Sequence, residues 1–451
     1  MLVLWLAFVF CALLWRWCQP SRSKLEPPKS PGALPLLGHL NLIIGDSAII
    51  AEPDDALTVA NACLGKHSMY DFAKPWLGNG LITAPVSVWQ QHRKLLNPTF
   101  KQLMLYGYMD VFNRQARRLV GKVSDQAGRG PFDYIPFVHQ NALETICKTT
   151  MNFDFADNTV INSEYMEAVD KIAVLMFRRV QEPWLYFDIT FKWSGLKKVL
   201  QKKRLELKQK SLDRMSEENE DEHLSEKAKT FLELLMAMSE KHGHFTDEEV
   251  RKHVDTIIVS GYDTVATALF FTTILIGSYP RVQQRLLEEL QNVFGESDRD
   301  VTKDDLSRLV YLEAIIKESL RIYTVAPAFA RNIDKDIKIK NFTLRAGKSC
   351  IVSLYGIHRH RMWGEDADEF RPERWLDPST LPANANAFVA FSLGRRQCIG
   401  KTYAMMSLKT SLAHFLRRYK VTADHSKMVL KMDILLKPLS GHQICVDQRT
   451  L

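Results

Sequence analysis

The sequence lacks two common signatures built on cysteine and glycine. It contains no Cys-x-x-Cys pair and no glycine-rich nucleotide-binding motif. Its seven cysteines have no paired spacing, which argues against a disulfide framework and a structural zinc site and favours a reducing compartment. The cysteines are at positions 11, 18, 63, 147, 350, 398 and 445.

The N-terminal apolar run lacks the features of a cleaved signal peptide. Residues Met1–Trp15 are apolar throughout, but no basic residue precedes them and no small-residue cleavage site follows. The run is shorter than the roughly 20 residues of a membrane span, although two apolar residues extend it beyond Arg16, which can snorkel. Positive residues after the run, including Arg22 and Lys24, would keep the body of the protein cytosolic. We therefore predict a non-cleaved signal anchor at residues 1–18.

The rest of the chain has an ordinary globular composition. The sequence is 46% hydrophobic and 25% charged, which is sufficient for a large core. Four prolines and two glycines in Glu26–Gly38 disfavour helix and strand, so residues 19–39 are predicted to form a stiff hinge before one domain at residues 40–451. The net charge of +8 is compatible with simple solubility, with attraction to an anionic membrane, or with an acidic redox partner.

One cysteine lies in a sequence context that suits a metal ligand. Cys398 has a glycine on each side in the sequence, at positions 394 and 400. Gly394 lets the backbone turn where a side chain would block it, and Gly400 allows a flat ligand to approach closely. Arg395 and Arg396 place positive charge beside an acidic group of that ligand.

The segment after this cysteine is predicted to be a helix. Residues 401–419 have helical periodicity, and the N-terminus of such a helix directs its positive dipole at the Cys398 sulfur, which favours thiolate over thiol. A lone thiolate in an apolar, arginine-flanked loop suits the axial ligand of a haem iron. The alternative is a buried structural cysteine that lies beside arginines by chance.

A long central helix is predicted to carry a polar island, residues 260–264, within its apolar run. Thr246–Glu249 is a capping box at its start, and Ile257–Ile276 is apolar enough to resemble a membrane span in isolation. The polar residues within the run favour a buried core helix, in which Asp263 would be costly to bury unpaired. Thr264 can donate a hydrogen bond to the preceding turn and open a groove. An acid and an alcohol in a groove over a metal would deliver protons, and a helix kink without chemistry is the alternative.

Two further pairs of residues share a helical face. Trp89 and Arg93 are four residues apart, so the tryptophan either packs on the arginine stem or joins it in reaching a buried carboxylate. Glu318 and Arg321 are three residues apart, where a surface ion pair is the usual interpretation. Neither pair by itself indicates a particular function.

The remaining segments are assigned from their patterns. Residues 101–245 are predicted to be mostly amphipathic helix, with an aromatic cluster at Pro183–Phe187 that could enter the membrane interface and line substrate entry. Lys74–Ile82 is interpreted as a loop, residues 333–355 as short strands, and Leu430–Val446 as a hairpin.

Taken in order, these motifs resemble the cytochrome P450 family of haem-thiolate monooxygenases. Phe391–Gly400 matches the family pattern Phe-x-x-Gly-x-Arg-x-Cys-x-Gly in full, and the tryptophan–arginine pair, the glutamate–arginine pair and Phe370–Trp375 occur in the family order. The resemblance covers essentially the whole chain after the anchor. It implies a mainly α protein with a large helical body and a small β-sheet subdomain.

The resemblance is closest to the microsomal clan that contains fatty-acid omega-hydroxylases, in a form similar to arthropod members. Pro75–Ile82 and Arg93–Phe100 carry this closer match. Two features depart from the pattern. Leu40–Ile50 is short, so a first helix and the first strand of the small sheet are expected to be missing. Ser260 occupies the position where many clan members have a glutamate that forms an ester with haem, so a non-covalently attached haem b is expected.

The resemblance implies a role for each motif residue. Cys398 would be the iron ligand, in a loop whose Phe391, Gly394 and Gly400 contact the haem. Asp263 and Thr264 would guide protons during catalysis. Haem propionates would be bound by Trp89, Arg93, Arg331 and Arg396, and a buried structural network would join Glu318, Arg321 and Arg374.

The reaction implied is insertion of one oxygen atom from O2 into an apolar small molecule, such as a fatty acid, a terpenoid hormone or a xenobiotic. The implied partners are NADPH–cytochrome P450 reductase, cytochrome b5 as a further candidate, and the endoplasmic reticulum membrane with the catalytic domain in the cytosol. No nucleic-acid partner is expected. The alternative is a haem-binding P450-like protein with little or no turnover, which the shortened region near residue 50 motivates.

Overall fold

The computed structural model describes residues 48–152, part of 171–193, 230–242, 245–432 and 434–449. The predicted anchor, the hinge and most of the aromatic cluster at 183–187 lie outside these residues. The proposed shortening before residue 50 falls largely outside them and stays a prediction, but the described end of that segment, Ala48–Ile50, does form a strand of the small sheet.

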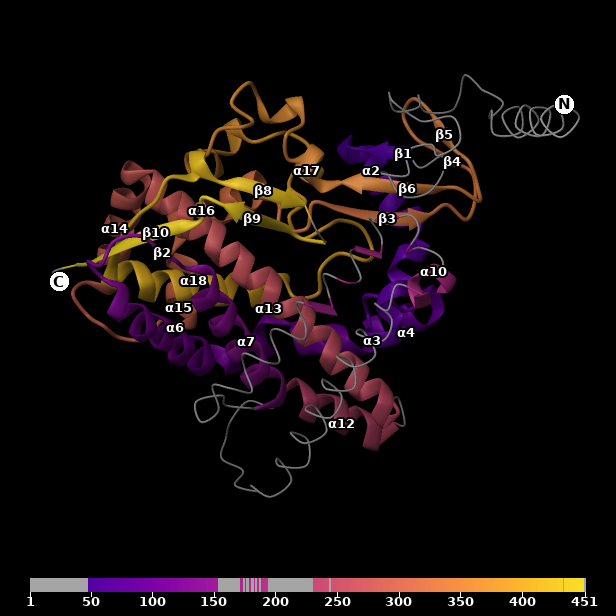
Figure 1. The fold of residues 1–451 in the computed structure, drawn as a ribbon, viewed down its shortest axis with the longest axis horizontal. Helices are drawn as coiled ribbons and strands as arrows, with labels where there is room; N and C mark the ends of the chain where they lie inside the picture. Colours follow the sequence, from indigo (N-terminus) through magenta and orange to yellow (C-terminus); the bar gives the residue numbers. More distant parts are fainter. Residues whose placement is uncertain are drawn as a thin grey trace, which may run out of the picture.

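The body of the protein is mainly helical, as the sequence predicted (Figure 1). The longer helices are α2 (Pro53–Ala62), α4 (Val86–Leu96), α6 (Met109–Val123), α7 (Ile135–Met151), α12 (Phe231–His242), α13 (Asp247–Ser278), α14 (Pro280–Phe294), α16 (Val310–Ile322) and α18 (Lys401–Arg418). The shorter ones are α3 (Lys74–Leu77), α5 (Gln102–Leu105), α10 (Asp188–Trp193), α15 (Lys303–Arg308) and α17 (Leu354–Ile357).

The strands form four small sheets within the described part of the chain. Their orders are β1-β6-β3, β2-β10-β7, β4-β5 and β8-β9. In the first sheet β1 pairs in parallel with β6, and β3 pairs with the other edge of β6 in the antiparallel direction. The strands are β1 (Ala48–Ile50), β2 (Phe132–Asp133), β3 (Ala328–Asn332), β4 (Ile337–Lys338), β5 (Thr343–Leu344), β6 (Ser349–Ser353), β7 (Tyr419–Thr422), β8 (Val429–Met432), β9 (Leu436–Ser440) and β10 (Gln443–Gln448).

The central helix α13 organises the core. Its capping box forms as predicted, because Thr246 Oγ1 accepts from the Glu249 N–H and the Glu249 carboxylate accepts from the Thr246 N–H at 3.0 Å. In Figure 1 it crosses the middle of the molecule, and it packs against α7, α16 and α18. Among the described residues it is the one helix long and apolar enough to cross a membrane, but 72% of its most apolar window is buried inside the protein. It is therefore a core helix, as predicted.

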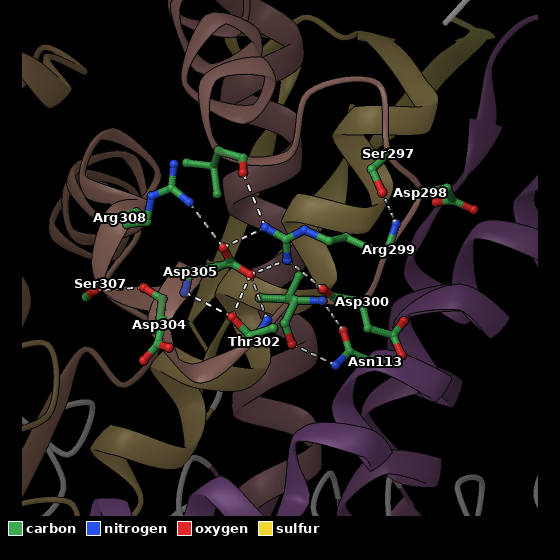
Figure 2. Close-up of polar contacts among 12 residues, drawn as sticks. Asn113, Ser297, Asp298, Arg299, Asp300, Thr302, Asp304, Asp305, Ser307 and Arg308 are labelled. Carbon is green, nitrogen blue, oxygen red and sulfur yellow. Dashed lines mark hydrogen bonds and ion pairs between the residues drawn. The ribbon is translucent and has the colours of Figure 1, made fainter.

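The loop between α14 and α15 is fixed by a local cluster of polar contacts that reaches α6 (Figure 2). Arg299 donates to the Asp305 carboxylate, which also closes a capping box with Thr302 at the start of α15. The Arg299 guanidinium holds the pKa of Asp305 well below its usual range. Asn113 of α6 donates to the Val301 carbonyl and accepts from its N–H, both at 2.9 Å. The ring of His414 in α18 contacts the same amide oxygen, at 2.8 Å. This contact fixes the helix whose N-terminus follows Cys398.

Two local predictions need correction. The segment predicted as a loop at Lys74–Ile82 begins with the short helix α3, because Pro75 is pre-set for the first helical turn. The predicted hairpin at 430–446 ends at Ser440, since β10 leaves it and joins β7 and β2 in another sheet. The second error arises because the choice of strand partner is not local.

Candidate active site

The loop before α18 holds Cys398 in a fixed turn. The Cys398 N–H donates to the Phe391 carbonyl at 2.9 Å, and the Gln397 N–H donates to the Gly394 carbonyl at 3.1 Å. Gly394 has a φ of +70°, and a Cβ there would lie 2.8 Å from the Cβ of Ala60 in α2. A side chain at this position would therefore both strain the backbone and displace α2.

Burial and the neighbouring charges shift the pKa of the Cys398 thiol in opposite directions. Burial of its sulfur among protein atoms raises the thiol pKa, whereas the Gly400 N–H and the charges of Arg93 and Lys401 lower it. The residue itself is exposed to solvent. The groups at the start of α18 compensate for burial only in part, so a thiolate here needs a further positive partner such as a metal ion.

Cationic side chains converge near this loop, and no carboxylate among the described residues forms an ion pair with them. The Arg396 guanidinium lies over the Trp89 ring at 4.4 Å and donates to the Ala84 carbonyl, but its Nε and Nη1 are buried without a hydrogen bond. Arg331 in β3 is 2% exposed, and its buried Nε is likewise unsatisfied. Burial and the Arg331 charge lower the pKa of Arg396 to about 10.

Lys66 joins this cluster and was missed from the sequence. Burial, followed by the charges of Arg331 and Arg396, places its pKa well below the usual value. It reaches the cluster through an isolated β-bridge to Arg331, which no local sequence pattern reveals. Three clustered cations, two of them with unsatisfied buried donors, require an anionic group for stability.

These residues fit a haem. Its two propionates would satisfy the buried donors of Arg331 and Arg396, and its iron would take the Cys398 sulfur. A Cβ built on Gly400 would meet only that sulfur, at 3.9 Å, so the backbone offers an open surface beside the ligand. The donor set and the glycine therefore suit a flat dianionic group with a thiolate-bound metal.

Arg93 and Trp89 of α4 support the loop as well as the cation cluster. Arg93 Nη1 donates to the Gln397 carbonyl at 2.9 Å, and its Nε donates to Asn97 Oδ1 at 2.7 Å. Trp89 is 4% exposed and forms the platform beneath the Arg396 guanidinium. The structure therefore brings both predicted residues to the cysteine loop, and Arg93 contacts the residue next to Cys398.

The motif residues Glu318, Arg321 and Arg374 form a fully buried network. Arg321 Nη2 donates to Glu318 Oε1 at 2.8 Å, and Arg374 Nε donates to the same oxygen at 2.8 Å. The Trp375 ring N–H and the Arg371 backbone N–H complete the shell of the carboxylate. One carboxylate thus holds α16 against the segment that precedes the cysteine loop.

The polar island of α13 has partners from two other elements. Thr264 Oγ1 donates to the Ser260 carbonyl at 2.6 Å, which is the back-bond that its position predicted. Asp263 Oδ2 pairs with Lys437 Nζ of β9 at 3.1 Å. Its Oδ1 is buried without a hydrogen bond and lies 3.8 Å from His139 Nε2 of α7. Asp263 therefore has the Lys437 ammonium at one oxygen and the His139 ring near the other.

A cysteine at a helix N-terminus, beside unsatisfied arginines in a mainly helical body, defines a haem-thiolate protein. The family model for cytochrome P450 matches residues 52–446. Cytochrome P450 4V2 of Homo sapiens is 33% identical over 417 residues, which cover 88% of this chain and 79% of that protein. Cytochrome P450 4c21 of Blattella germanica is 30% identical over 404 residues, covering 86% and 80%. Cytochrome P450 4d8 of Drosophila melanogaster is 29% identical over 437 residues, covering 92% and 93%.

The chain belongs to the cytochrome P450 family. It is a haem-thiolate monooxygenase, as the motifs predicted. The similar proteins from mammals and insects are all named as cytochromes P450 of group 4. This confirms the predicted clan and the similarity to arthropod members.

Proposed function

We propose that this monooxygenase acts at the endoplasmic reticulum membrane, with its catalytic domain in the cytosol. It oxidises an apolar small molecule, with fatty acids, terpenoid hormones and xenobiotics as the candidate classes. NADPH–cytochrome P450 reductase supplies the electrons, and cytochrome b5 is a second candidate donor. The apolar N-terminal run, the net charge of +8 and the lack of a dinucleotide motif support this assignment.

The observation that carries the proposal is the divided environment of Asp263. Bound haem would supply the activation of O2, with its iron held by Cys398 and its propionates by Arg331 and Arg396. Lys437 pairs with Asp263 Oδ2 and His139 Nε2 lies 3.8 Å from Oδ1, so the carboxylate is held in place beside Thr264 on α13. Thr264 Oγ1, anchored on the Ser260 carbonyl, presents a hydroxyl on the next residue of the same apolar helix.

The test of the proposed function has two stages. The reduced protein is examined for the thiolate type of CO-difference spectrum, and NADPH consumption and product are then measured with the reductase. A saturated fatty acid, a sesquiterpenoid and an aromatic xenobiotic serve as probes. A thiolate spectrum with turnover supports the proposal. The same spectrum without turnover on any probe supports the alternative of a haem-binding protein without activity, and the absence of the spectrum contradicts both.

Replacing Thr264 with alanine is expected to uncouple NADPH consumption from product formation. The hydroxyl that helps to direct protons is lost while the haem contacts remain, so product per NADPH should fall about tenfold and peroxide should rise. Thr256→Ala is the matched control, because Thr256 makes the same back-bond, at 2.7 Å, about two turns earlier on α13. An unchanged product-to-NADPH ratio in Thr264→Ala would count against the proton role.

The haem is expected to be held without a covalent bond to the protein. Ser260 has no carboxylate for an ester, and its hydroxyl already donates to the Thr256 carbonyl. Acidified organic solvent should therefore extract all of the haem from the denatured protein. Ser260→Glu is the informative comparison, since it alone restores a carboxylate at this position. Haem that remains with the unsubstituted polypeptide would refute the prediction.

A further inference from the structure

His358 is a fully buried histidine for which the catalytic motifs leave no role. It follows α17 and is 0% exposed. Its backbone carbonyl accepts a hydrogen bond from Arg321 Nη1 at 2.9 Å, so it adjoins the buried network around Glu318. Its ring stacks on Phe388 with an interplanar angle of 21°.

Both ring nitrogens of His358 have a partner, and the partners fix the tautomer. The Val389 backbone N–H lies 2.9 Å from Nε2, and because an amide N–H can only donate, Nε2 must be the acceptor. Nδ1 therefore carries the hydrogen and donates to Thr324 Oγ1 at 2.7 Å, and Thr324 Oγ1 donates to the Arg321 carbonyl at 3.2 Å. Burial and the neighbouring arginine charges lower the His358 pKa to about 3, so the ring stays neutral.

The acceptor at Nε2 supports the first turn of the cysteine loop. Val389 is 1% exposed, so its N–H is shielded from bulk water and depends on the His358 ring as its acceptor. Its carbonyl accepts from the Ser392 N–H at 2.8 Å, and Ser392 has a φ of +63°, which is unusual for a residue with a side chain. Phe391 immediately precedes Ser392, and its carbonyl accepts a hydrogen bond from the Cys398 N–H. The His358 ring is thus a bridge from the Arg321 network to the turn that sets the cysteine in place.

We propose that His358 is a positioning residue for haem ligation: its Nε2 holds the Val389 N–H and so keeps the Cys398 loop in the conformation that presents the sulfur to the iron. The alternative is a core histidine that contributes only to global stability. The proposal goes beyond the monooxygenase assignment because it concerns the maintenance of the ligand, not the substrate or the electron donor.

Two isosteric substitutions separate these possibilities. His358→Gln can place its amide oxygen near the position of Nε2 and so accept from Val389, whereas His358→Asn can place its NH2 group near Nδ1 and donate to Thr324, leaving the Val389 N–H unsatisfied. The measurement is the rate at which the reduced CO complex of the holoenzyme loses its thiolate spectrum, at a temperature well below unfolding. We expect about a tenfold faster loss in His358→Asn and a rate within about twofold of the parent in His358→Gln.

The urea midpoint of each variant is the companion measurement. A purely structural histidine would lower the midpoint in both variants and leave the thiolate spectrum of the folded fraction unchanged. Equal rates of loss in the two variants, or no change in either, would overturn the proposal.

Amide hydrogen exchange of the unsubstituted holoenzyme decides the matter if the variants do not fold. The proposal requires the Val389 amide to be protected together with the Cys398 amide. A Val389 amide that exchanges as fast as an unprotected loop amide would overturn it.

Discussion

Replacing Cys398 with serine is expected to abolish the thiolate signature of the reduced CO complex completely. A bound metal deprotonates a thiol outright, whereas a serine hydroxyl remains a far poorer ligand at neutral pH. The surrounding protein adds to the effect, since burial of this position disfavours an additional negative charge without a metal. The CO-difference spectrum at matched haem content is the measurement.

Cys445→Ser is the matched control for this substitution. Cys445 is a partly buried free cysteine in β10, away from the motif loop in sequence, and its replacement should leave the spectrum unchanged. If Cys398→Ser retains the band of the parent protein, another residue must ligate the iron, and the assignment of the site is wrong.

Removing the charge of Glu318 should destabilise the protein by about 3–5 kcal/mol, because it leaves the buried Arg321 guanidinium without its counter-charge and the buried Arg374 guanidinium with only Asp366. Glu318, Arg321 and Arg374 are each no more than 1% exposed, so water cannot replace the lost carboxylate. In Glu318→Gln one amide oxygen can still accept, but the NH2 group would oppose the arginine donors. Urea unfolding followed by tryptophan fluorescence is the measurement, with haem retention recorded in parallel.

Glu248→Gln provides the comparison for the buried network. Glu248 pairs with Lys252 at 2.7 Å on α13, but its side chain is 67% exposed. A surface pair of this kind contributes no more than about 1 kcal/mol. Similar losses in the two variants would show that burial does not set the energy of the Glu318 network.

The sequence was sufficient for the parts of the site that local chemistry determines. The capping box at Thr246, the start of α14 at Pro280 and the helix after Cys398 are each determined by neighbouring residues, so composition and periodicity locate them. The back-bond of Thr264 follows from helical geometry in the same way. The loop motif around Cys398 was recognisable because its glycines and arginines are contiguous in the chain.

Residues that reach the site through distant pairings were not predictable in this way. Lys66 enters the cation cluster through a bridge to Arg331, and Lys437 meets Asp263 only because the β8–β9 hairpin packs near α13. His358 faces Val389 through a hydrogen bond between segments that share no pattern. Such contacts depend on the assembled fold, and single-sequence periodicity carries no information about them.

The parallel pairing of β1 with β6 has a consequence for how the protein is made. The two strands are about 300 residues apart, so a ribosome adding roughly 5–20 residues per second leaves β1 without its partner for roughly 15–60 s. Loop closure and strand pairing take microseconds once both segments exist, so translation sets the time at which this sheet forms. Until then β1 is an open template for other nascent chains. Synonymous codons that slow the ribosome between the two strands would lengthen that exposure without changing a single residue.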